Sequence, residues 1–96
     1  METKHSPAPW FIDPILGSTV LHGGEGGPFL VARIAMHDRE EGLANARIVA
    51  SAPQMLAMLQ ELRECAEYWS EYDVPVGIVD RIDAVIATAL GVSPNT

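Results

Sequence analysis

The sequence predicts an α+β fold, in which a small antiparallel β-meander of two to three strands is followed by a short helix and an antiparallel helical hairpin. Three observations carry this prediction. Residues 10–36 hold short strand-like runs separated by glycine and proline, and apolar residues recur at three- and four-residue steps over 55–69 and again over 78–90. The 96 residues are enough for a single small domain, with 1–9 as an extended N-terminal arm and 92–96 as a disordered tail.

Three stretches are typical of strands: residues 10–12, 15–21 and 29–36. Gly17 weakens the middle stretch and predicts a bulge there. Asp13-Pro14 and the glycine-rich residues after the second stretch supply the turns, so the stretches are expected to form a meander. In the last stretch a period-two pattern predicts that four apolar residues share one face, namely Leu30, Ala32, Ile34 and Met36.

The helical part covers residues 38–91 and is predicted to contain a joint. Asp38 and Glu41 have the spacing of a capping box, so a short helix is expected to begin there. Pro53 disfavours helical geometry at the residue before it, and the Ser51 hydroxyl can cap a new helix. A kink or a two-residue break is therefore expected at this point.

The two later helices are expected to pack against each other as a hairpin. The first has one apolar stripe, in which Leu62 is predicted to be buried, Cys65 to be a small buried hydrophobic residue and Trp69 to belong to the core. A break over residues 73–77 precedes the second helix, and Gly91 is expected at its C′ position. The full stripe is Met55, Met58, Leu59, Leu62, Cys65, Ala66 and Trp69.

Composition and charge argue against several classes of function. The formal net charge is −7 and Lys4 is the only lysine, so binding to a nucleic-acid backbone is not expected. No apolar run approaches the roughly 20 residues of a membrane span, and Met1 to Pro9 carry no apolar signal region, so the expected location is the cytoplasm. One cysteine and three scattered histidines give no zinc pattern, and neither a metal nor a cofactor is expected.

Two motifs resemble those of a known family. The N-terminal motif is His5-Ser6-Pro7-Ala8-Pro9-Trp10, and the downstream motif is Ala44-Asn45-Ala46-Arg47-Ile48-Val49-Ala50-Ser51-Ala52-Pro53-Gln54-Met55-Leu56. Their order and approximate separation are similar to those in a family of small proteins encoded by tailed phages and prophages. The resemblance implies a phage accessory protein that acts in the infected or lysogenic bacterium. By analogy of origin, it also implies an antagonist of host defence.

The sequence contains candidate binding surfaces and no catalytic motif, so an enzyme is not expected. Serines lack a nucleophile-elbow context, and paired acids fall on helix faces predicted to be solvated. One candidate surface brings arginines and an aromatic residue to the start of the helical part, where they could stack a base and hold a phosphate. The alternative there is a solvated face paired with nearby acids. The members of this surface are Trp10, Arg33, His37, Arg39 and Arg47.

A second candidate surface is a protein interface on the first helix of the hairpin. Tyr68 and Tyr72 lie beside the apolar stripe, and Glu64 and Glu67 lie on its acidic side. Three functions stay open: a stoichiometric inhibitor of a host protein, an oligomeric protein that sequesters a small anionic nucleotide, and a structural or regulatory phage component. At least a homodimer is expected, because two apolar helix stripes exceed what a small sheet can cover.

Overall fold

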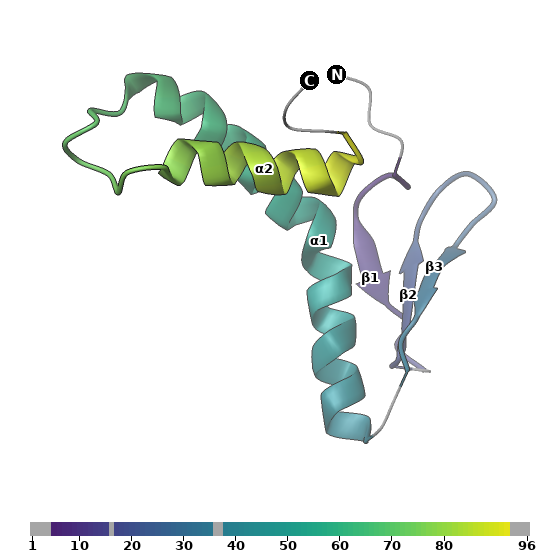
Figure 1. The fold of residues 1–96 in the computed structure, drawn as a ribbon. Helices are drawn as coiled ribbons and strands as arrows, with labels where there is room; N and C mark the ends of the chain where they lie inside the picture. The colour runs from purple at the N-terminus through teal and green to yellow at the C-terminus, as the bar shows by residue number, and fades with distance from the viewer. Residues whose placement is uncertain (1–4, 16, 36–37, 93–96) are drawn as a thin grey trace. The chain divides into compact units, whose positions relative to one another are not determined.

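The computed structural model describes residues 5–15, 17–35 and 38–92. Three strands form one antiparallel sheet in the order β1-β2-β3, and helices follow it, so the predicted α+β fold is confirmed (Figure 1). The described chain divides into two compact units, one from His5 to Gln54 and one that holds the described residues from Met55 onward. The elements are β1 (Trp10–Ile12), β2 (Thr19–His22), β3 (Phe29–Arg33), α1 (Arg39–Cys65), the 3-10 helix η1 (Ala66–Tyr68) and α2 (Ile78–Leu90).

The sheet has a bulge in β3 and not at Gly17. Val20 pairs with Ala32 while Leu21 pairs with Leu30, which leaves Val31 as the extra residue. The bulge interrupts the predicted alternation, so Leu30 is 53% exposed although Ala32 is half-buried. Gly17 instead lies in the turn before β2 with φ of +67°, a conformation that suits glycine. The predicted end of the last strand, Met36, lies outside the described residues.

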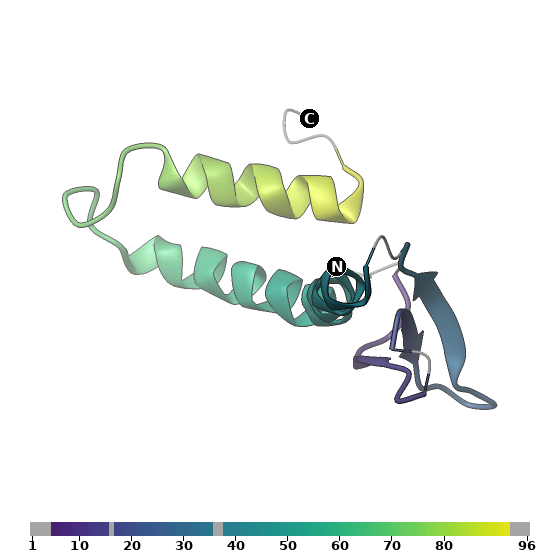
Figure 2. The same cartoon turned by 90° about the horizontal axis from the view of Figure 1, so that it is seen from below.

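The first half of α1 lies beside the sheet, as both views show (Figures 1 and 2). On β2, Val20 is fully buried, and on α1 the buried residues are Gly42, Ala46 and Pro53. Spacings of four and seven residues place these three on one side of the helix, and two of them, Gly42 and Ala46, are small. The core of the first unit is therefore built on β2 and on a small-residue face of α1.

Helix α1 is continuous through Pro53, so the predicted two-residue break is wrong. Proline removes one backbone donor from the helix, but Pro53 is itself buried, and this burial offsets part of the cost. Ser51 does not cap a new helix, because its hydroxyl donates to the Arg47 carbonyl within the same helix at 2.8 Å. The start of α1 is as predicted: the Glu41 N–H donates to Asp38 Oδ1 at 2.8 Å.

The second unit is a helical hairpin made of the last part of α1, η1 and α2 (Figure 2). Ile82 and Ala87 of α2 are its buried residues. Gly91 ends α2 with φ of +74°, and the Val92 N–H donates to the Ala87 carbonyl at 2.9 Å, which is the predicted glycine C-cap.

The apolar stripe of α1 is less buried than predicted. Leu62 is 39% exposed and Cys65 is exposed, so the predictions that both are buried are wrong. Trp69 is half-buried and lies beyond the helix, because α1 ends at Cys65 and a 3-10 turn follows. The reason is geometric: α2 is a single short helix and covers one side of α1, whereas the stripe extends around to another side.

Candidate functional site

The connection between α1 and α2 folds upon itself through local hydrogen bonds. The Trp69 N–H donates to the Ala66 carbonyl at 3.1 Å, the Asp73 N–H to the Ser70 carbonyl at 3.0 Å and the Ile78 N–H to the Pro75 carbonyl at 3.2 Å. Each bond spans three residues, which is the spacing of tight turns. Residues 66–80, called the hairpin tip below, therefore present side chains from consecutive turns.

An open hollow of about 550 Å³ lies in the hairpin tip. Its apolar lining comes from consecutive parts of the connection, chiefly Trp69, Tyr72, Val74, Pro75, Val76 and Ile78. Tyr72 is 89% exposed and Val76 is fully exposed, while Tyr68, one residue before Trp69, is 91% exposed. Apolar and aromatic side chains grouped around a hollow are typical of a surface that binds another molecule.

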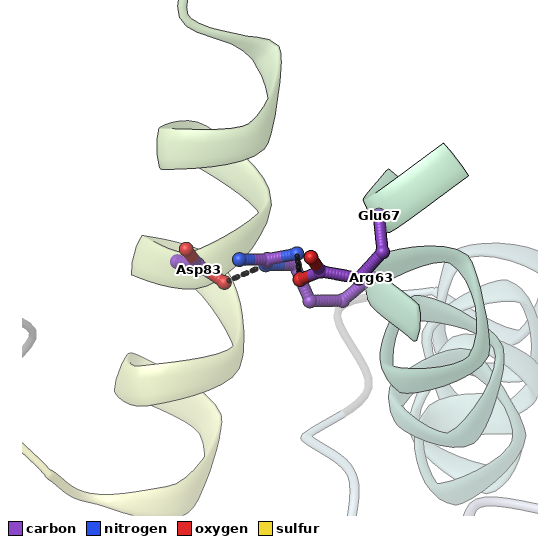
Figure 3. A network of polar contacts seen from close by, with 3 residues as sticks. All are labelled: Arg63, Glu67 and Asp83. Atoms are coloured by element: carbon purple, nitrogen blue, oxygen red, sulfur yellow. Dashed lines mark hydrogen bonds and ion pairs between the residues drawn. The ribbon is translucent and has the colours of Figure 1, made fainter. Parts of the chain in front are cut away.

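The charge around the hairpin tip is strongly negative. Residues 53–83 hold seven acids and two arginines. Arg63 neutralises two of the acids: its Nε donates to Asp83 Oδ1 at 2.7 Å and its Nη1 to Glu67 Oε1 at 3.0 Å (Figure 3). The other five are Glu61, Glu64, Glu71, Asp73 and Asp80, and all five are exposed.

Arg63 joins the two helices of the hairpin. The hydrogen bond to Asp83, followed by the one to Glu67, raises the pKa of the Arg63 guanidinium above its ordinary value. The contact with Asp83 fixes α2 against α1, and the contact with Glu67 reaches into η1. Arg63 therefore helps to position the start of the hairpin tip.

The structure places the residues predicted for a protein interface in the second unit. Glu64, Glu67, Tyr68 and Tyr72 are all exposed, and Glu67 is also engaged by Arg63. The prediction that all four lie on one helix is wrong, because α1 ends at Cys65, Glu67 and Tyr68 belong to η1, and Tyr72 lies in the connection. Whether they bind a partner stays a prediction. The sequence does not predict the hollow, because residues 73–77 indicate only a break between two helices. Two valines flanking Pro75 in a connecting loop were the available signal.

The residues predicted to hold a nucleotide lie in the first unit, except that His37 is outside the described residues. The Trp10 indole donates to the Ser6 carbonyl at 3.1 Å and meets the His5 ring edge-on at a centroid distance of 6.3 Å. Arg39 and Arg47 are exposed on α1, about 12 Å apart along its axis at 1.5 Å per residue.

Arg33 is exposed at the end of β3, and its strand partner is Thr19. The structure thus brings the described members of this cluster into one unit but separates Arg39 from Arg47. A ligand that engaged both would need anionic groups at two separate points. The nucleotide site stays a prediction.

The part of the chain that the structure describes contains neither a candidate metal site nor a candidate membrane-spanning helix. Its histidine, cysteine and acidic side chains form no group of three or more that is suited to a metal ion. None of its helices combines the length and apolar character that crossing a membrane requires.

Comparison with known proteins gives the family. Residues 1–93 match the model of a family described as Salmonella phage P22 protein Y8K6. The chain therefore belongs to this phage protein family, which confirms the phage origin that the resemblance implied. It is a phage accessory protein. Neither the curated proteins nor the solved structures contain a significant match to the chain.

Proposed function

We propose that this phage accessory protein acts without catalysis, by stoichiometric binding of a host protein through the hairpin tip. The observation that carries the proposal is the nearly complete exposure of Tyr68, Tyr72 and Val76, two of them at the hollow. Exposing such side chains to water is unfavourable, and aromatic residues are enriched at the centres of protein interfaces.

The acidic surroundings indicate the chemistry of the partner. Five exposed acids lie in or next to the hairpin tip, so a partner with basic residues around an apolar anchor would be complementary. Complementary charge speeds association and discriminates against acidic partners. The anchor would enter the hollow, and the basic residues would face the rim.

The biological role we propose is antagonism of a host defence system in the cytoplasm of the infected or lysogenic bacterium. Its support is membership of a phage protein family. A small binding protein can block a larger host protein by occupying one of its surfaces, and stoichiometric inhibition of this kind needs no cofactor.

The proposal is tested by affinity capture from the bacterial host with the tagged full chain. The parent chain is compared with Tyr72→Ala and with Ala57→Ser, a control change at an exposed position on α1 outside the hairpin tip. We expect a discrete host protein that is retained by the control and lost with Tyr72→Ala. Calorimetry with the purified partner should then give a fixed stoichiometry.

Three results would contradict the proposal. One is capture that is indifferent to Tyr72→Ala. Another is turnover of the captured protein into a modified product. The third is capture of a phage structural or regulatory protein in place of a host protein, which would support a role in the phage particle or its control.

A further inference from the structure

Four apolar side chains on α1 form a second exposed surface, separate from the hairpin tip. Met55 is 47% exposed, Met58 54% and Leu62 39%, and Cys65 is also exposed. Their spacings of three, four and three residues place them in one line along the helix. They are called the α1 seam below.

Helix α2 does not cover the α1 seam. At 100° per residue, Arg63, which bonds Asp83 of α2, lies about 120° around the helix from the centre of the seam. The acids Glu61 and Glu64 lie on the other side, so the seam is an uncharged strip between the α2 side and an acidic side. Part of the apolar surface of the hairpin therefore has no cover within the second unit.

We propose that the α1 seam is the contact between two copies of this chain. Alternating spacings of three and four residues are those of the a and d positions in a helix pair, where each side chain enters a gap on an equivalent helix. A twofold interface uses the same surface on both copies, and this seam needs no other element to be complementary to itself.

Charge favours a second copy over a different partner at this surface. Each chain carries a formal net charge of −7, so two copies repel each other, and the repulsion is least where neither presents acids at the contact. The α1 seam meets that condition, whereas the acidic hairpin tip does not. The α1 seam therefore suits self-association, and the hairpin tip suits a basic partner. A dimer formed through the seam would leave the hairpin tip of each copy free.

The small size of the α1 seam determines how strong a dimer we expect. Four partly exposed side chains are a fraction of the roughly 800 Å² per partner that stable interfaces bury, so the dimer should be weak and dependent on concentration. Sedimentation velocity of the full chain from low to high micromolar concentration should show a monomer that converts to a dimer.

Two variants test whether the seam makes the contact. Met58→Lys puts a charge in the seam, whereas Ala57→Lys puts the same charge one residue away at an exposed position outside it. We expect Met58→Lys to weaken the dimer at least tenfold, and Ala57→Lys to leave it within about twofold of the parent. Circular dichroism checks that both variants keep their helices.

Cys65 supplies a readout that needs no variant, because it is the single cysteine and lies in the seam. Its rate of modification by a thiol reagent should fall in the parent as the dimer forms. A monomer at every concentration, a dimer that tolerates Met58→Lys, or a dimer in which Cys65 stays fully reactive would overturn the proposal. None of these results depends on capture of a host protein, so the two proposals fail separately.

Discussion

Arg63 shows how a single side chain organises the hairpin. Its guanidinium holds Asp83 of α2 and Glu67 of η1, and these hydrogen bonds raise its pKa above the ordinary value. A group whose pKa is raised by folding stabilises the folded state below its ordinary pKa and loses that contribution only as the pH rises through the folded pKa. For an arginine this window lies in strong alkali, so the contribution of Arg63 should stay constant across physiological pH.

Two apolar residues of α2 that lie three positions apart differ in burial. Ile82 is 9% exposed and Val85 is 51% exposed. We expect Ile82→Ala to lower the free energy of unfolding by about 2–5 kcal/mol, because it leaves a cavity in a small core. Val85→Ala should change it by less than about 0.5 kcal/mol. Urea unfolding of the two variants checks this, and equal losses would show that α2 is turned differently about its axis.

Arg39 tests the nucleotide alternative at the scale of one residue. Because Arg39 and Arg47 are about 12 Å apart along α1, we expect no binding heat from cyclic or linear nucleotides in calorimetry. We also expect Arg39→Ala to leave capture of the protein partner unchanged. Nucleotide binding that Arg39→Ala weakens by about 1–3 kcal/mol, the range for a hydrogen bond to a charged group, would favour the sequestering function.

The turn before β2 depends on Gly17. Its φ is +67°, and a Cβ at this position would lie 3.0 Å from Leu43 Cδ2, so a side chain would be strained and would also crowd α1. We expect Gly17→Ala to cost about 1–3 kcal/mol of stability. Gly23 is the matched control, because a Cβ there meets nothing within 4 Å. A melting temperature for Gly17→Ala equal to that of Gly23→Ala would contradict this account of the turn.

The elements differ in how far the sequence predicts them. Helix α2 and its end at Gly91 follow from local signals, namely apolar periodicity and a glycine that can adopt positive φ. The bulge at Val31 depends on how two strands pair, which no local pattern encodes. The sequence does not predict that α1 is continuous, because a proline removes a backbone donor and therefore predicts a break. The burial of Pro53, which offsets part of that cost, depends on the fold of the first unit and cannot be read from a local pattern.

The candidate surfaces were predictable to a different extent. Tyr68 and Tyr72 were expected on the first helix of the hairpin beside its apolar stripe, but α1 ends at Cys65 and both are exposed beyond it, Tyr68 in η1 and Tyr72 in the connection. Periodicity identified the line through Met58 and Leu62, but it could not show how much of that line a neighbouring helix covers. The hollow could not be predicted without knowing how the connection between α1 and α2 folds, since its lining residues have no regular spacing.

At the scale of the whole molecule, net charge should control the rate of partner binding. Reversal to lysine of Glu71, which lines the hollow, and of Glu64, which is exposed near the end of α1, removes negative charge without touching Glu67, which Arg63 holds. We expect the double variant to associate more slowly with the captured host protein and to show a flatter dependence of the association rate on salt. Stopped-flow measurements at several salt concentrations check this, and unchanged rates would mean that the acids do not face the partner.

Binding of a host protein at the hairpin tip is tested by photo-crosslinking inside infected bacteria. A photoreactive amino acid replaces Tyr72 in one version of the full chain and Ala57, exposed on α1, in another. If the tip is the binding surface, light should link position 72 to one host protein and leave position 57 without that product. A product of equal yield at both positions, or none at position 72 while the chain still acts in the cell, would contradict binding at the tip.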